Sequence, residues 1–181
     1  MVSFPGFSTP AASTEAPLEM LAACHIRIQH QCEVLQRLAS HLRRHGSDEQ
    51  ARQAAKSIMR YFDTAAVDHH ADEEQDLFPA LLESVAGSDP VCIRQLIDRL
   101  CHEHRQLEAG WRKLRKVLVH VAAGEQAELP QHDVDTFVSQ YMSHLDLEEN
   151  ELLPMANRLL GQHHIERIGR AMRDRRGITT G

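Results

Sequence analysis

The sequence predicts an all-α fold: an antiparallel up-down-up-down four-helix bundle followed by a short C-terminal helix. Leu and Ala number 20 each among 181 residues, whereas Val, Ile and Thr together number 24, and this balance favours helix over sheet. Glycines and capping residues divide the chain into long segments in which apolar residues recur at steps of three and four. A chain of this length is expected to fold as one domain with a sizeable core.

The first helix is expected to run from Thr14, whose hydroxyl can cap it, to Gly46, which suits the left-handed residue after a helix. Ser47 then offers a new N-cap, and Gln50 three residues later completes a capping box. A second helix is therefore expected to continue to about Ser84.

The next break is the segment Gly-Ser-Asp-Pro at residues 87–90. Asp89 is expected to cap the third helix and Pro90 to occupy its first position, where the missing N–H costs nothing. This helix is expected to extend to about Ala123 and to stop at Gly124.

The fourth helix is expected at residues 131–160, between Pro130 and Gly161. A basic segment at residues 164–174 can form a short fifth helix that caps the bundle. The expected organisation is thus a flexible N-terminal tail, the four-helix bundle, and a basic helix with a tail, at residues 1–13, 14–161 and 162–181.

Each of the four helices places one histidine on its apolar stripe, and the second and fourth also place a glutamate there, one turn later. On the first helix, for example, the stripe comprises Leu21, His25, Ile28, Cys32, Leu35, Ala39 and Leu42. A buried carboxylate costs several kcal/mol unless it is paired or bound to a cation. The six polar residues that need an explanation are His25, His69, Glu73, His104, His144 and Glu148.

The four histidines are predicted to lie at one height in the bundle. Antiparallel neighbours meet at equal distances from their shared turn, so the midpoint of each pair should fall on a turn. The successive spacings are 44, 35 and 40 residues, and the midpoints are Ser47, the bond between Ala86 and Gly87, and Gly124. Three predicted turns agree, so an up-down-up-down bundle places the imidazoles in one layer.

The second and fourth helices also share a repeated motif, H-x-x-x-E-E-x-x-L-x-P. A shift of 75 residues superimposes the pairs His69 and His144, Glu73 and Glu148, Glu74 and Glu149, and Pro79 and Pro154. Because residues i and i+4 share a helix face, each motif directs one imidazole and one carboxylate to the same point.

The remaining motif positions are expected to lie outside that point. Glu74 and Glu149 point about 100° away and are expected on the flank of the bundle. Pro79 and Pro154 are expected to kink or end their helices just beyond the site.

Four imidazoles and two carboxylates form a mixed nitrogen and oxygen set that suits iron or manganese, with zinc as an alternative. Six ligands exceed one tetrahedral site, so two metals fit better. If both glutamates bridge and an oxo or hydroxo group joins the metals, about two coordination positions remain open for small ligands.

In the order His25, His69-x-x-x-Glu73, His104 and His144-x-x-x-Glu148, the chain resembles the hemerythrin-like, or HHE cation-binding, family over residues 18–160. The resemblance implies two non-haem iron ions, oxo- or hydroxo-bridged, with the two glutamates as bridging ligands and the four histidines as terminal ones. Relatives include oxygen carriers, sensors of oxygen or redox state, and proteins that repair iron–sulphur clusters damaged by nitric oxide.

The chain departs from the oxygen carriers of this family, which use a fifth histidine one turn along the third helix. Here that position is Glu108, which either supplies a third carboxylate or leaves the position vacant. Tyr141, one turn before His144, is a further candidate for a hydrogen bond to the centre or its ligand, with a core aromatic as the plainer alternative. The repair proteins usually carry an extra cysteine-containing N-terminal domain, and this chain has only a short tail there.

The other histidines are expected to be solvated rather than ligating. They are His30, His41, His45, His70, His102, His120, His132, His163 and His164. Cys24 and Cys101 lie near the metal layer in sequence, where a redox role and a small buried hydrophobe are the two alternatives, and the second is favoured.

Composition excludes several other classes of protein. The formal charge is −6, which argues against a nucleic-acid partner, and the five arginines between Arg167 and Arg176 are read as a solvated helix end or a weak contact surface. No apolar run is long enough to span a membrane, and the tail lacks the features of a signal peptide. Four cysteines without a C-x-x-C pair suit a reducing, cytoplasmic location. The oligomeric state is not readable from the sequence.

The leading hypothesis is therefore a cytoplasmic di-iron protein that binds O2, NO or a peroxide for sensing, storage or stress defence. One alternative is a di-iron enzyme of NO or peroxide detoxification or iron–sulphur cluster repair, assisted by Glu108 or Tyr141. Another is a structural bundle that holds zinc.

Overall fold

The computed structural model describes residues 16–85 and 91–178, and every regular element in these ranges is helical, which confirms the all-α prediction. The helices in chain order are α1 (Pro17–His45), α2 (Glu49–Asp63), α3 (Ala65–Asp72), α4 (Phe78–Ser84), α5 (Val91–Ala123), α6 (Gln131–Leu147), α7 (Leu153–Leu159) and α8 (Gln162–Arg175). Two π-helical turns, η1 (Glu73–Leu77) and η2 (Glu148–Leu152), join α3 to α4 and α6 to α7. The expected helix start at Thr14 and the expected cap at Asp89 and Pro90 lie outside the described residues.

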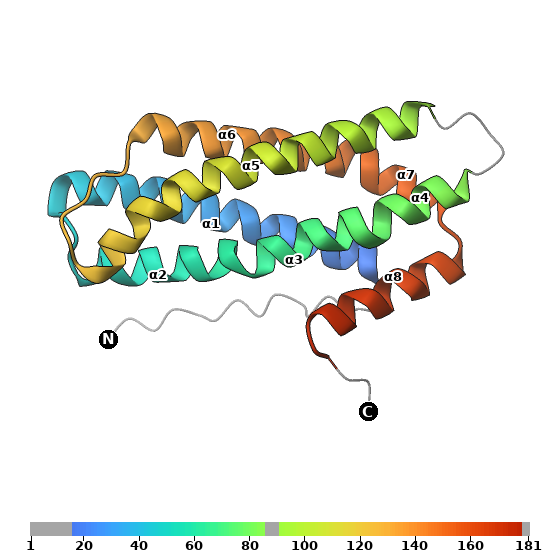
Figure 1. Cartoon of the computed structure of the whole chain (residues 1–181), viewed down its shortest axis with the longest axis horizontal. Helices are drawn as coiled ribbons and strands as arrows, with labels where there is room; N and C mark the ends of the chain where they lie inside the picture. The colour runs from blue at the N-terminus through green and yellow to red at the C-terminus, as the bar shows by residue number, and fades with distance from the viewer. Residues whose placement is uncertain (1–15, 86–90, 179–181) are drawn as a thin grey trace.

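The long helices form a bundle. Helix α1 contacts α2 and α6, and α5 contacts the same two helices, so the four close a ring around a common core (Figure 1). Helix α8, the short C-terminal helix of the sequence prediction, packs across α1, α3 and η1. None of the helices in the described ranges is long and apolar enough to cross a membrane.

Two glycines make the turns at one end of the bundle. Gly46 and Gly124 have φ of +70° and +84°, positive values that glycine adopts without steric cost. A Cβ atom on Gly46 would lie 2.7 Å from the side chain of Gln126, so the turn after α1 lies against the link after α5 (Figure 1). Both predicted glycine stops are confirmed.

The cap of α2 differs from the sequence prediction. Asp48, not Ser47, is the N-cap, and its Oδ1 accepts a 2.9 Å hydrogen bond from the backbone N–H of Ala51. Ser47 is buried and its hydroxyl makes no hydrogen bond. The expected capping box with Gln50 is therefore absent, because an aspartate one residue later offers a charged acceptor in the right place.

The second predicted helix is also divided. At Thr64, the backbone leaves the helical conformation, and the side-chain hydroxyl donates a 2.6 Å hydrogen bond to the carbonyl of Arg60. A threonine hydroxyl that competes for helix carbonyls in this way commonly bends a helix. The break separates α2 from α3, which carries the first H-x-x-x-E-E motif.

The prolines of the repeated motif do not end their helices. Pro79 and Pro154 are the second residues of α4 and α7, which continue directly from η1 and η2. In each π turn the N–H before the proline reaches five residues back, from Phe78 to the carbonyl of Glu73 in η1 and equivalently to Glu148 in η2. A proline has no N–H for a regular helix hydrogen bond, and the wider π turn just before it accommodates that loss. The structure therefore has a π turn where the sequence predicted a kink.

The core consists of two apolar clusters with a polar layer between them. The predicted stripe of α1 is buried over its whole length. One cluster spans the middle and the glycine-turn end, and includes Ile28, Phe62, Leu114 and Phe137. The other lies at the opposite end and includes Leu21, Leu81, Leu100, Ile168 and Met172. The polar side chains that separate them are the six that the sequence marked out.

Candidate metal centre

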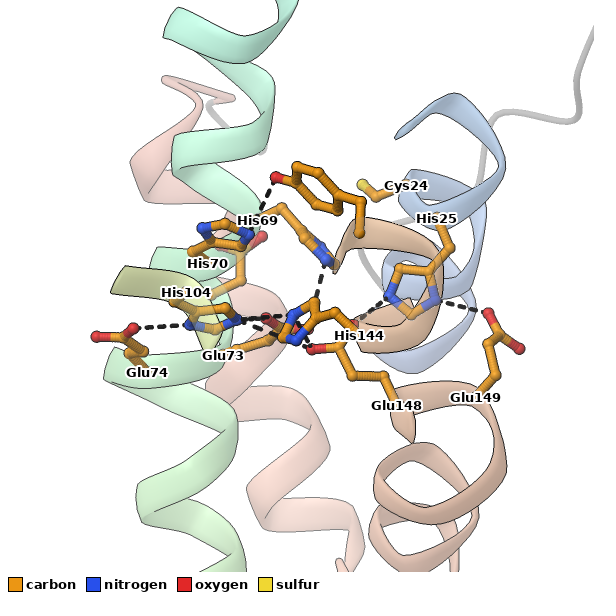
Figure 2. Close-up of polar contacts among 12 residues, drawn as sticks. Cys24, His25, His69, His70, Glu73, Glu74, His104, His144, Glu148 and Glu149 are labelled. Atoms are coloured by element: carbon orange, nitrogen blue, oxygen red, sulfur yellow. Dashed lines mark hydrogen bonds and ion pairs between the residues drawn. The ribbon is translucent and has the colours of Figure 1, made fainter. Parts of the chain in front are cut away.

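The polar layer brings His25, His69, Glu73, His104, His144 and Glu148 together. All six side chains are at most 1% exposed, and they project inward from α1, α3, η1, α5, α6 and η2 (Figure 2). The turn midpoints that predicted one height for the histidines thus correspond to one layer in the structure.

Within the layer the ligand atoms form two groups that share both carboxylates. His25 and His69 group with Glu73 and Glu148, and His104 and His144 group with the same two glutamates. In each group, one nitrogen or oxygen atom per residue lies within 4.8 Å of every other. Such an arrangement offers two adjacent cation positions joined by two carboxylates.

The hydrogen-bonding state of these atoms tests whether a cation fits. His25 Nε2, both nitrogens of His69 and both oxygens of Glu73 and Glu148 are buried and make no hydrogen bond. Some of these atoms lie at ion-pair distance, such as His144 Nε2 and Glu148 Oε1 at 3.0 Å. When the imidazole is neutral with its hydrogen on Nδ1, such a contact places the lone pair of Nε2 against a lone pair of the carboxylate oxygen. Buried polar atoms are almost always paired, so a set of converging, unpaired ligand atoms fits metal ions.

The electrostatics of the layer also call for positive charge. Burial, with repulsion from Glu148, raises the pKa of Glu73 to about 7. Burial opposes ionisation of Glu148 too, but attraction to the facing histidines outweighs burial and holds the pKa of Glu148 well below the usual value. Burial alone would lower the pKa of His25 and His104. The carboxylates of Glu73 and Glu148 outweigh burial and raise these pKa values to about 9 and about 10. Burial lowers the pKa of His69 to about 3. Without a cation, protons on His25 and His104 supply the charge that the carboxylates need.

Three of the histidines are held from behind by carboxylates that lie outside the layer. In each, Nδ1 contacts a glutamate oxygen, and because an ionised carboxylate can only accept, Nδ1 donates. In the neutral ring, Nε2 is then left with a lone pair that can bind a cation in the layer. The pairs are His25 with Glu149 at 2.6 Å and His104 with Glu74 at 2.7 Å (Figure 2), and His144 with Glu103 at 2.9 Å. Carboxylate–imidazole pairs of this kind usually orient metal-binding histidines.

Glu74 and Glu149 lie on the flank of the layer, as expected, but the sequence analysis did not foresee their contacts with its histidines. Each points away from its own motif histidine, as predicted, but reaches the histidine of a neighbouring helix. Partial burial alone would raise the pKa of Glu74, but hydrogen bonds from Arg105 and His104 lower it. The Glu74 carboxylate therefore stays ionised. The Glu-Glu doublet, present in both copies of the motif, was the signal in the sequence.

Glu108 is not among the residues that the structure brings together. Its side chain is 53% exposed and pairs with Arg112 at 2.9 Å. The third-carboxylate alternative thus finds no support. The position one turn after His104 on α5 faces outward and contributes no group to the layer.

His70 is placed differently from the sequence expectation. It is only partly exposed, its ring stacks on that of His104 with centroids 4.0 Å apart and planes 14° apart, and Tyr141 Oη lies 3.3 Å from its Nε2. One of its nitrogens also lies within 4.8 Å of ligand atoms of His104 and His144. The prediction of a solvated His70 is wrong, because α3 turns it toward the edge of the layer.

Of the remaining candidates, Tyr141 reaches the layer through its contact with His70 and through an edge-on ring contact with His144, with centroids 6.4 Å apart. Cys24 is buried beside His25, and Arg27 donates a 3.0 Å hydrogen bond to its sulphur. Cys101 is partly buried. Neither cysteine reaches the two groups of ligand atoms within the part of the chain that the structure describes.

A surface pocket of about 280 Å³ adjoins one side of the layer. It lies between the α3–η1 segment and α5, and its walls include both His70 and His104. The pocket therefore reaches His104, one residue of the group that also contains His144.

Comparison with known proteins agrees with this site. An uncharacterized protein of Haemophilus influenzae is 30% identical over 167 residues, which cover 92% of this chain and 94% of the relative. A family model described as the hemerythrin HHE cation binding domain matches residues 16–156, a span that contains all six residues of the layer. The chain therefore belongs to the hemerythrin HHE cation-binding family.

Proposed function

We propose that the protein is a non-haem di-iron protein that binds O2, NO or a peroxide for sensing, storage or stress defence. In this proposal His25 and His69 hold one iron, His104 and His144 hold the other, and Glu73 and Glu148 bridge them. The observation that carries it is the pair of buried ligand groups that share two otherwise unpaired carboxylates. The irons would supply open coordination positions and redox chemistry.

The protein's own residues would do three things for such a centre. The two apolar clusters exclude water above and below the layer. The three outer glutamates orient the imidazoles, which lowers the cost of ordering them on binding. The up-down-up-down order of the bundle, which the spacing of the histidines implies, would keep the two motif-bearing segments across the layer from one another.

Iron is proposed over zinc because the set offers two shared carboxylates and more ligands than one closed tetrahedral site uses. The four free cysteines support a reducing, cytoplasmic location as part of the same proposal.

Metal analysis together with an absorption spectrum tests the proposal. The wild-type protein should hold two irons and show the near-ultraviolet absorption of an oxo-bridged pair, whereas His69→Ala and His144→Ala should lose iron and that absorption. His102→Ala, which removes an exposed histidine two residues before His104, is the matched control and should keep both. Two irons retained by both layer variants would overturn the proposal, and a colourless protein with zinc would favour the structural alternative.

Anaerobic mixing of the reduced protein with nitric oxide, in the presence of an excess of a chemical reductant, separates binding from turnover. A stable nitrosyl complex favours sensing or storage. Repeated consumption of nitric oxide favours the alternative that the protein is a di-iron enzyme.

A further inference from the structure

We infer that His70, positioned by Tyr141, is a hydrogen-bonding residue for small anionic or diatomic ligands that reach the metal centre through the pocket between α3 and α5. The inference rests on the proposed function and deepens it. The inference adds two features to the proposed metal centre: the side from which a small molecule enters, and a residue that contacts the bound molecule. The six residues of the layer would still hold the metals.

The position of His70 supports the first step. The residues that line the pocket include Val67, His70, Glu74, His104 and Arg105. Of these, His104 belongs to the layer and His70 stacks directly upon it. The outer part of the pocket contains the Arg105–Glu74 ion pair, 2.5 Å long. A molecule in the pocket can therefore contact both His70 and His104.

The stacking also shows that His70 is not a seventh ligand in this arrangement. An imidazole binds a metal in the plane of its ring, so two rings that share one metal have planes that both pass through it. The rings of His70 and His104 lie nearly parallel, one over the other, with centroids 4.0 Å apart. Both planes cannot then contain the same ion, so His70 beside His104 is placed to contact a bound ligand instead.

The contact with Tyr141 leaves the His70–Tyr141 pair with one hydrogen atom to donate. If His70 Nε2–H donates to the Tyr141 oxygen, the phenol hydrogen remains free. If the phenol donates to Nε2, Nδ1–H of His70 remains free. In both cases the pair, with 3.3 Å between Oη and Nε2, retains one donor for a third group. Azide, peroxide and nitric oxide all accept hydrogen bonds, and each fits a pocket of about 280 Å³.

Azide binding to the iron-loaded full chain tests the role of His70. His70→Leu, which keeps bulk but removes both nitrogens, should retain two irons and bind azide about tenfold more weakly, the loss of a hydrogen bond to a charged group. His70→Gln should restore part of the affinity. Unchanged azide affinity in His70→Leu would overturn the inference, and loss of iron would show instead that His70 is a ligand.

Tyr141→Phe tests the positioning role without removing bulk from the core. It should keep both irons and weaken azide binding less than His70→Leu does. The double variant should bind no more weakly than His70→Leu alone, because the hydroxyl acts through His70. Full additivity, or no effect of Tyr141→Phe, would contradict a role for this pair.

The entry side is tested by blocking the pocket. Val67, on the pocket wall, is 57% exposed, and Val119, elsewhere on the surface, is 44% exposed. Val67→Trp should slow azide association severalfold in stopped-flow mixing, whereas the matched Val119→Trp should not. Equal rates in both variants would contradict entry by this pocket.

The two failures are distinguishable. A wild-type protein without two irons, or one that forms no azide complex, would overturn the proposed function and with it the inference. A wild-type protein that binds azide, together with variants at residues 67, 70 and 141 that bind it equally well, would overturn the inference alone.

Discussion

At the residue scale, the two glutamates of each doublet have different roles one position apart. Glu148 faces the layer without a hydrogen bond, while Glu149 holds Nδ1 of His25. Glu73 and Glu74 divide in the same way. A doublet on one helix thus serves two histidines: its first member meets the histidine of its own motif, and its second orients a histidine on a neighbouring helix.

This division predicts that the outer glutamate controls metal affinity. Glu149→Ala should weaken metal binding by roughly 10–100-fold, because His25 loses the acceptor that fixes its tautomer and ring orientation. Glu149→Gln should have a smaller effect, since the amide oxygen still accepts from Nδ1. Competition with a chelator of known affinity measures both.

Glu151→Ala is the matched control for this experiment. Glu151 is an exposed acid in the same π turn, and its loss should leave metal affinity unchanged. Equal weakening by Glu149→Ala and Glu151→Ala would mean that only general negative charge matters.

The sequence predicted which residues form the layer but not what lies around it. Helical spacing and turn midpoints locate positions along and around a helix, and so they brought the six inward residues together. They do not show how far a flanking side chain reaches across to another helix, which is why Glu74 and Glu149 were missed. His70 was missed for a related reason: its ring position depends on stacking against His104, a contact between helices.

At the element scale, the π turns explain how the repeated motif combines a binding residue with a proline. Each π turn begins at the inward glutamate and ends two residues before the proline. The proline pattern alone predicted a kink, since the sequence does not distinguish a bend from a widened turn. Both accommodate a proline, which lacks the N–H of a regular helix hydrogen bond.

The cap of α2 gives an element-scale prediction with a pH dependence. The backbone hydrogen bond from Ala51, followed by pairing with His41, lowers the pKa of Asp48. Its stabilisation is therefore present above the ordinary pKa of an aspartate and is lost as pH falls through the lowered value. Asp48→Ala should lower the melting temperature by a few degrees at neutral pH.

Asp48→Asn separates the cap from the charge. Asparagine caps as well as aspartate but does not ionise, so this variant should melt close to the wild type at neutral pH. The difference between wild type and Asp48→Ala should shrink on acidification, while that between Asp48→Asn and Asp48→Ala should not. Circular-dichroism melts of the three proteins from neutral pH to about pH 3 provide the test, and a pH-independent wild-type difference would contradict it.

At the scale of the whole molecule, α8 fastens the C-terminal end of the chain to the segment that carries the layer. Asp72, directly before Glu73, is fully buried, and both Arg175 and Arg176 pair with it. Arg175 also pairs with Asp76 at 2.8 Å. The sequence analysis interpreted this basic segment as a solvated helix end or a contact surface. Two of its arginines instead form ion pairs within the molecule.

This attachment predicts a large loss of stability when only one side of it is removed. Arg175→Gln with Arg176→Gln leaves the Asp72 carboxylate buried without its cations, which costs about 3 kcal/mol or more. For a chain of this size the melting temperature should fall by roughly 10 °C. Thermal unfolding of the metal-free protein, followed by circular dichroism, measures the change without a contribution from bound metal.

Two further variants show whether the buried charge is the cause. Adding Asp72→Asn to the double arginine variant should raise its melting temperature again, because a neutral amide is less costly to bury than a lone carboxylate. Arg167→Gln removes an arginine of the same helix whose pair with Glu83 is exposed, and it should change stability little. If the triple variant melts no higher than the double one, α8 stabilises the bundle through the apolar contacts of Ile168 and Met172, and the arginines contribute only surface charge.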